Sequence, residues 1–329
     1  MAGKKKQKTT GPLDLKGVLA GLQTKFGADH VRLGAPDAGS YSVVSTGSYG
    51  LDRATGIGGF PAGRIVEIYG PESSGKTTIA LQAVADMQRQ GKEAAFVDVE
   101  HAVDPNYAES LGVDMSSLLL TQPSSGEQAL ETVDYIAASG AVGCIVVDSV
   151  AALVPQAEID GEVGDSHVGR QARLMGQALR KLTPIAARNG VLVIFINQIR
   201  MKVGVMFGSP ETTPGGNALK FYASMRVVIR RRSQVKEGEV AVANETMARV
   251  VKNKCAPPFA EATFQIRYGQ GVDYAREVVE AAIDRGIVDK SGAWISYGKI
   301  KEQGLPRFVD RVRSEASLCD DLRGRLLES

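Results

Sequence analysis

Residues 65–90 read as a strand, a glycine-rich turn and a helix in direct succession, and this order restricts the fold more than any other stretch of the chain. The turn runs Gly70-Pro71-Glu72-Ser73-Ser74-Gly75-Lys76-Thr77, and Thr78 continues into the helix. A glycine-rich turn at a helix N-terminus surrounds phosphate oxygens with backbone N–H groups. The pattern predicts a P-loop for a nucleoside triphosphate, with Lys76 on the β- and γ-phosphates and Thr77 on Mg²⁺. The flanking strand and helix disfavour a chance match.

Apolar strands and helices alternate beyond this motif. Expected strands cover 65–69, 94–99, 118–121, 144–148 and 191–197, and expected helices cover 77–90, 127–139 and 168–189. This alternation predicts an α/β fold with a mainly parallel sheet covered on both faces. Pro184 is expected to kink or end the last helix. Segments 218–232, 247–254 and 261–268 look like antiparallel edge strands. A helix near 274–285, a strand near 293–297 and a final helix follow.

Three regions are expected along the chain. Residues 1–36 hold a basic tail and an amphipathic helix over 11–30, whose apolar face needs either its own domain or a neighbouring subunit. Residues 37–270 form the core, and 271–329 form a small C-terminal domain. The net charge is +2, the three cysteines are far apart, and no apolar run approaches the roughly twenty residues of a membrane helix. We therefore expect a cytoplasmic protein that does not contact a membrane.

Three polar residues stand where strands of the predicted sheet end. Asp148 closes the apolar run 144–148 and is placed to hold the water shell of Mg²⁺. Glu100 follows a neighbouring strand and suits a base that orients an attacking water, although a surface glutamate would look the same. Gln198 ends the strand 191–197 and is placed to sense a γ-phosphate. Together with the P-loop, these residues predict hydrolysis of ATP.

Five stretches resemble the bacterial RecA recombinase family: residues 70–78 (GPESSGKTT), 147–153 (VDSVAAL), 195–202 (FINQIRMK), 215–224 (GGNALKFYAS) and 250–254 (VVKNK). The resemblance runs from about residue 13 to about residue 300. It implies a RecA-type P-loop ATPase core with an N-terminal polymerisation helix and a small α+β C-terminal domain. It further implies a DNA-dependent ATPase that forms a helical homo-filament on single-stranded DNA. Such a protein pairs that strand with homologous double-stranded DNA, exchanges strands in recombinational repair, and promotes self-cleavage of a LexA-type repressor in the SOS response.

The resemblance also assigns roles to individual residues. ATP and Mg²⁺ would be held by Lys76, Thr77 and Asp148, with Glu100 as the catalytic base and Gln198 as the γ-phosphate sensor. Adenine-side contacts would come from Asp104, Tyr107 and Tyr268. Lys252 and Lys254 would reach the ATP of a neighbouring subunit, whereas a basic edge strand is the alternative interpretation.

Two loops would face DNA, at 158–169 and 199–213. The first is acidic, so its neighbour Arg173 is the better candidate for a phosphate contact. The second mixes cations with apolar groups, which suits a single strand. A hairpin that buries Phe207 is the alternative, and the glycines of this region disfavour it. The candidate DNA contacts are Arg173, Arg200, Met201, Lys202, Phe207, Gly215, Gly216 and Asn217. The basic run Arg226 with 230–232 reads rather as a solvated or subunit-contact face.

The chain departs from the family pattern at three places. It ends at Ser329 without an acidic tail, which predicts DNA uptake that is less restrained at low Mg²⁺. Arg170 and Val228 stand where a small or apolar residue and an Asp are expected. The alternative function is another DNA motor on the RecA fold, either a hexameric helicase or a RadA-like branch-migration protein. The latter should carry zinc-binding cysteines near its N-terminus, and none precedes Cys144. A non-enzymatic binding module is disfavoured by Lys76, Glu100 and Asp148.

Overall fold

The computed structural model describes residues 14–27, 31, 41–162, 169–201, 204 and 210–328. The chain divides into two compact units, residues 1–40 and 41–329. In the first unit, α1 (Leu15–Phe26) begins where Asp14 accepts a hydrogen bond from Gly17 N (2.8 Å), so the helix predicted over 11–30 is shorter than expected. None of its residues is fully buried within this unit. The lysine-rich tail lies outside the described residues.

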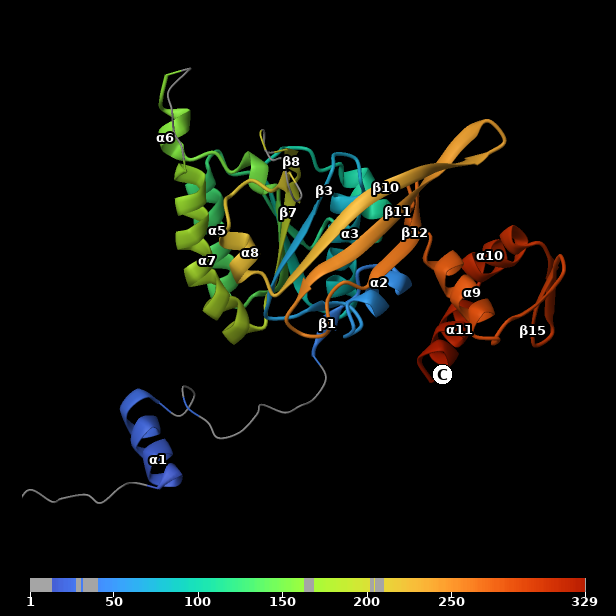
Figure 1. Cartoon of the computed structure of the whole chain (residues 1–329), viewed down its shortest axis with the longest axis horizontal. Helices are drawn as coiled ribbons and strands as arrows, with labels where there is room; N and C mark the ends of the chain where they lie inside the picture. Colours follow the sequence, from blue (N-terminus) through green and yellow to red (C-terminus); the bar gives the residue numbers. More distant parts are fainter. Residues whose placement is uncertain are drawn as a thin grey trace, which may run out of the picture. The chain divides into compact units, whose positions relative to one another are not determined.

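A nine-stranded sheet forms the centre of the second unit, in the order β13-β12-β11-β10-β3-β7-β6-β4-β5. Figure 1 labels β3, β7, β10, β11 and β12 of this sheet. Strands β3, β4, β5, β6 and β7 and the start of β10 run parallel to one another. Strands β11, β12 and β13 continue the sheet beyond β10 in antiparallel pairs. This confirms the predicted mainly parallel sheet with antiparallel additions. The strands are β3 (Ile65–Gly70), β4 (Glu93–Asp98), β5 (Leu118–Thr121), β6 (Val142–Asp148), β7 (Leu192–Gln198), β10 (Met225–Glu237), β11 (Val240–Asn253), β12 (Glu261–Arg267) and β13 (Gly271–Val272).

Two apolar cores cover the two faces of this sheet. Because side chains alternate along a strand, Val66 and Ile68 of β3 enter one core and Ile65 enters the other. The first core contains residues of α2 (Tyr49–Ala54), α3 (Lys76–Arg89) and α4 (Pro105–Ser110). The second contains residues of α5 (Gly126–Ser139), α7 (Arg170–Asn189) and α8 (Ala218–Tyr222), which lie together on one side of the sheet in Figure 1. Among the described residues, no helix is both long and apolar enough to span a bilayer.

Two local predictions differ from the structure. Pro184, expected to kink or end its helix, does not end it, because α7 continues to Asn189 and the residues Leu182 and Ala186 on both sides of the proline are buried; a kink stays a prediction. The segment predicted as a strand from residue 218 begins instead as the short helix α8, which buries Leu219. The remaining short elements are β1 (Val43–Val44), β2 (Phe60–Pro61), a 3₁₀ turn (Val150–Ala152), α6 (Gln156–Ile159), β8 (Arg200–Met201) and β9 (Glu211–Thr212).

The C-terminal part has a core of its own, built from three helices and a small antiparallel sheet. One final helix was expected, but α10 and α11 are separate helices, interrupted at Glu315. Its elements are α9 (Tyr274–Asp284), β14 (Asp289–Ser291), β15 (Trp294–Tyr297), β16 (Ile300–Gln303), α10 (Leu305–Ser314) and α11 (Ala316–Glu328).

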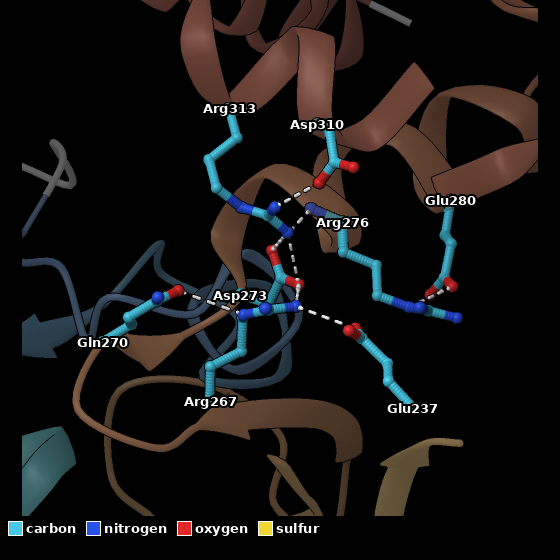
Figure 2. Close-up of polar contacts among 8 residues, drawn as sticks. All are labelled: Glu237, Arg267, Gln270, Asp273, Arg276, Glu280, Asp310 and Arg313. Carbon is cyan, nitrogen blue, oxygen red and sulfur yellow. Dashed lines mark hydrogen bonds and ion pairs between the residues drawn. The ribbon is translucent and has the colours of Figure 1, made fainter. Parts of the chain in front are cut away.

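Buried carboxylates tie this part to the main sheet. Asp273 caps α9 and accepts two hydrogen bonds from Arg313 Nη2 (2.8 and 3.0 Å), and Arg267 of β12 lies 3.9 Å away (Figure 2). Glu277, one turn further along α9, accepts from Ser48 Oγ (2.8 Å), Gly50 N (3.0 Å) and Tyr49 N (3.2 Å) at the start of α2. The contact between the C-terminal part and the main sheet therefore includes hydrogen bonds as well as apolar packing. Asp273 and Glu277 both accept hydrogen bonds there.

Glu277 makes the stability of the fold depend on pH. Burial raises the pKa of this carboxyl from 4.5 to about 8, against the opposing effect of its hydrogen-bond donors. Between pH 4.5 and 8 the folded state therefore binds more protons than the unfolded state, and the free energy of unfolding falls as pH rises through this window. We expect a decrease on the order of a few kcal/mol in urea titrations. Glu277→Gln should flatten this decrease, and an unchanged slope in the variant would contradict the assignment.

Candidate nucleotide site and nucleic-acid interface

The P-loop joins the end of β3 to the start of α3. Gly70 can only be glycine, since a Cβ there would meet Ile229 O at 2.1 Å. Gly75 stands before α3 in the left-handed region (φ 95°) and makes no side-chain cap, so the first N–H groups of the helix are left for another acceptor. Lys76 Nζ donates to Pro71 O (2.7 Å), and Ser74 Oγ is buried without a partner. Orphaned donors and a folded-back lysine fit a phosphate group in this loop.

A cavity of about 250 Å³ opens on the loop. Its far wall comes from α4 and from strands β11 and β12. Tyr107 OH and Thr78 Oγ1 form a hydrogen bond (2.8 Å), and Tyr268 OH donates to Asn244 Oδ1 (2.9 Å). Two aromatic rings beside a phosphate cradle suit a flat base such as adenine. The lining residues are Ser73, Ser74, Gly75, Lys76, Thr77, Thr78, Tyr107, Asn244, Thr246, Ile266 and Tyr268.

Asp104 lies at the N-terminus of α4, and its adenine-side contact stays a prediction. It is not among the residues that line the cavity, and its side chain caps α4 by accepting from Asn106 N (2.9 Å) and Tyr107 N (3.4 Å). In this structure Asp104 therefore positions the helix that carries Tyr107. Sequence reasoning also missed Asn244 and Thr246, although these two residues alternate on β11 and Thr246 Oγ1 is a buried atom without a partner.

Thr77 and Asp148 meet where β6 ends. Thr77 Oγ1 donates to Asp148 Oδ2 (2.8 Å). Burial raises the pKa of Asp148 to about 6, and the Thr77 hydrogen bond and Lys76 act in the opposite direction. Burial lowers the pKa of Lys76, which Asp148 and Glu100 partly offset. A hydroxyl beside one carboxylate is a donor set that Mg²⁺ uses when phosphate oxygens and waters complete its shell. The described residues contain no cluster of three or more His, Cys, Asp or Glu suited to a metal.

Glu100 and Gln198 are in contact beside this pair. Glu100 Oε1 accepts from Gln198 Nε2 (3.2 Å) and from Ser149 Oγ, and Glu100 N donates to Asp148 O (3.3 Å). The ends of β4, β6 and β7 thus bring together the three strand-end residues that the sequence singled out. Ser149 was missed, and its position next to Asp148 was the available signal.

The two lysines predicted to act between subunits lie away from this cavity. Lys252 Nζ donates to Lys220 O (2.5 Å) and Phe221 O (3.1 Å), and Lys254 Nζ donates to Phe221 O (3.3 Å). Burial, Lys254 and Arg226 lower the pKa of Lys252 to about 8. These lysines therefore cap the C-terminus of α8, whose Phe221 is 72% exposed.

Strand register explains this separation. Lys254 N donates to Ser224 O and Ser224 N donates to Ile65 O, so Lys254 is level with the start of β3. The P-loop begins at the other end of that strand, about 16 Å away. Neither lysine lines the nucleotide cavity of its own chain.

Several candidate DNA contacts lie on the surface near the end of β7. Arg173, Arg200 and Met201 are exposed, and β8 pairs with β9 as a short hairpin at the base of the 199–213 loop. Gly216 and Asn217 are also exposed, whereas Gly215 is buried and its N–H donates to Gln171 Oε1 (3.1 Å). Lys202, Phe207 and residues 163–168 of the first loop lie outside the described part of the chain.

Other basic and unusual residues have defined places. Arg230 pairs with Glu211 at the end of the second loop, and Arg226 pairs with Glu67 inside the sheet. Arg231 and Arg232 are exposed, so a solvated face fits these two residues but not Arg226, whose side chain is 13% exposed. Arg170 is exposed at the start of α7, and Val228 is buried beside Tyr69 of β3.

Comparisons with known proteins place the chain among close relatives. Residues 14–273 match the profile of the RecA N-terminal domain. Protein RecA of Acinetobacter baylyi is 61% identical over 316 residues, which are 95% of this chain and 90% of that protein. Protein RecA of Thioalkalivibrio sulfidiphilus is 60% identical over 317 residues, 95% of this chain and 92% of that protein. The crystal structure of the RadB recombinase aligns with a TM-score of 0.53 at 24% identity, covering 70% of this chain and 98% of that one, and shares the fold.

Lys76 provides a direct test of the nucleotide cavity. Lys76→Ala removes the buried ammonium from the phosphate cradle, and we expect affinity for a fluorescent ATP analogue to fall by at least about tenfold. The matched control is Lys92→Ala, which removes an exposed lysine after α3. Equal affinity in the Lys76 variant and the parent, measured by equilibrium titration, would show that the nucleotide binds elsewhere.

Proposed function

The chain belongs to the bacterial RecA family, and we propose that its ATP site is a switch that is completed only when subunits assemble on single-stranded DNA. The protein is a DNA-dependent ATPase that acts as a recombinase in DNA repair. One observation carries the proposal. Lys252 and Lys254 lie at the opposite edge of the sheet from the P-loop of the same chain, so a single chain cannot bring them to its own nucleotide.

Within one chain, the residues of the cavity bind and orient ATP. Lys76 and the first amides of α3 hold the phosphates, and Tyr107 and Tyr268 flank the base, with Asp104 fixing Tyr107 through its helix cap. Thr77 and Asp148 would hold Mg²⁺, which neutralises charge on the transferring phosphoryl group when bound. Glu100 then serves as the base that orients the attacking water. Ser149 and Gln198 donate to Glu100 and restrict its carboxylate to the edge of the sheet.

Between chains, the two lysines would complete the site. Here they donate to the carbonyls that end α8, and a γ-phosphate of an adjacent subunit offers stronger, charged acceptors. Binding that anion favours the protonated form of Lys252, whose pKa of about 8 leaves part of the population neutral near that pH. A cation supplied to a phosphoryl group in trans contributes roughly 10³–10⁵ in rate. The rate of ATP hydrolysis would therefore rise when subunits assemble.

Gln198 connects the nucleotide to DNA. It ends β7, and only Ile199 separates it from β8 and the 199–213 loop, which carries Arg200 and Met201. We assign single-stranded DNA to this loop and to Arg173, with Gly216 and Asn217 beside it. We further propose that the protein forms filaments, pairs its bound strand with homologous double-stranded DNA, promotes self-cleavage of a LexA-type repressor and is cytoplasmic. Membership of the RecA family supports these four properties. Relatives named RecA align over 95% of the chain, which favours a recombinase over a helicase or a RadA-like motor.

Mixing two defective variants tests whether the lysines act across subunits. Lys76→Ala lacks a working P-loop but keeps the lysines, and the double variant Lys252→Ala/Lys254→Ala lacks the lysines but keeps the P-loop. In a mixed filament with random order, roughly a quarter of the interfaces combine an intact P-loop with intact lysines. We expect DNA-stimulated ATPase and strand exchange in the mixture to exceed the sum of the two variants alone.

Co-sedimentation on single-stranded DNA establishes that both variants enter the same assemblies. A mixture that contains both variants on DNA and still shows only the sum of their separate activities would exclude action in trans.

Gln198→Ala tests the link to DNA. The variant keeps the P-loop and the cavity wall, so we expect the affinity for ATP to change by less than about threefold. It loses the side-chain donor to Glu100. We therefore expect the ratio of single-stranded DNA affinities with ATP and with ADP, called the gain below, to fall by about tenfold or more. Fluorescence anisotropy of a labelled oligonucleotide with ATP and with ADP measures this gain. Equal gains in variant and parent would refute the role of Gln198.

A further inference from the structure

A carboxylate is buried in the middle of the sheet, on the strand that leads to the P-loop. Glu67 of β3 is 0% exposed, while the residues on both sides of it, Val66 and Ile68, belong to the apolar core. Its carboxylate accepts from Arg226 Nε on β10 and from Asn197 Nδ2 on β7 (2.9 Å). A buried charge is tolerated only when it is paired and hydrogen-bonded, and here each neighbouring strand supplies one donor.

Asn197 is also 0% exposed, and all of its polar groups are used. Its Nδ2 donates to Glu67 Oε1 and to Pro214 O (3.2 Å), and its Oδ1 accepts from Gln198 N (2.9 Å). Pro214 directly follows the 199–213 loop, and Gln198 directly precedes it. One side chain therefore holds both ends of the loop assigned to DNA.

Arg226 connects the Glu67 carboxylate to the strand that carries Lys252, one of the two lysines proposed to act on a neighbouring subunit. Its guanidinium lies over the ring of Tyr69 (4.6 Å), the residue before Gly70, and its backbone position on β10 pairs with Lys252 on β11. Its side chain is 13% exposed, and its Nε donates to Glu67 Oε2. Glu67 is thus the buried point where three strands meet: β3 leads to the P-loop, β7 ends in Gln198, and β10 pairs with the strand of the lysines.

We propose that Glu67, Asn197 and Arg226 are positioning residues that couple the DNA loop to the ATP site. The proposal rests on the function assigned to Gln198 above. Because Asn197 holds Gln198 N and Pro214 O at once, the end of the DNA loop cannot shift without moving the backbone of the sensor. Glu67 fixes the amide orientation of Asn197, since its carboxylate accepts only from the NH₂ side. Arg226 fixes Glu67.

A purely structural role would give a different result. Apolar side chains of similar volume would fill this part of the sheet without the cost of desolvating a charge, so stability alone does not require the arrangement. If the three residues only stabilise the core, their removal lowers the unfolding midpoint and leaves the coupling between ATP and DNA unchanged. If they position Gln198 and the loop, the coupling falls even where the protein stays folded and binds ATP.

The test compares Asn197→Ala with Gln198→Ala and with a control, Asn189→Ala. Asn189 also donates to two backbone carbonyls, Ala137 O (2.7 Å) and Ala138 O (3.2 Å), but it lies at the far end of α7. The measured quantity is the ratio of single-stranded DNA affinities with a non-hydrolysable ATP analogue and with ADP. We expect Asn197→Ala to lower this ratio by about tenfold while ATP affinity stays within about threefold, and Asn189→Ala to keep it.

Glu67→Gln provides a second, nearly isosteric variant in case Asn197→Ala does not fold. It keeps an oxygen acceptor but removes the charge that holds Arg226, and we expect a smaller decrease of the ratio in the same direction. A folded Asn197 or Glu67 variant with the parental ratio, beside a Gln198→Ala variant that has lost it, would overturn this inference and leave the proposed function standing. A parental ratio in Gln198→Ala would instead overturn the proposed function.

Discussion

The parallel pairing of β3, β7, β6 and β4 is the constraint on which the rest of the molecule depends. Parallel strands end at the same edge of a sheet, so Gly70 is paired with Gln198 and Asp98 with Asp148. These strands are buried on both faces, and a slip of one residue would turn every core side chain to the opposite face. The apolar contacts of the strands therefore also set the positions of the candidate catalytic groups at their ends.

The same sheet separates the lysines from the nucleotide of their own chain. β10 runs parallel to β3, and the hairpin at Gly238 reverses the chain, so β11 ends near the start of β3. Its first residues, in contrast, reach the nucleotide cavity, where Asn244 forms part of the wall. A single antiparallel strand thus contributes one end to the site of its own chain and the other end to a surface that faces away. The proposed dependence on a neighbouring subunit rests on this reversal.

The predicted site residues that lie together in the structure share one property: each ends an apolar run beside the P-loop. Asp148 and Gln198 could be predicted because strand ends of a parallel sheet converge whatever the loops do. The wall residues Asn244 and Thr246 could not, because no local pattern shows which antiparallel strand folds over the cavity. The helix cap made by Asp104 follows from an Asp directly before a proline, whereas its contact to the base stays a prediction.

Polar residues inside otherwise apolar strands are the hardest to interpret from sequence, because their meaning depends on partners far along the chain. Glu67 and Arg226 are 159 residues apart, and Glu67 and Asn197 are 130 apart. Each looks like an isolated exception until the strand order puts β3 between β7 and β10. A three-way contact held by directional hydrogen bonds has few alternative arrangements, unlike an apolar core, which can repack at small cost. A rigid polar point between the P-loop strand and both ends of the DNA loop is therefore suited to transmit a displacement that apolar packing would absorb.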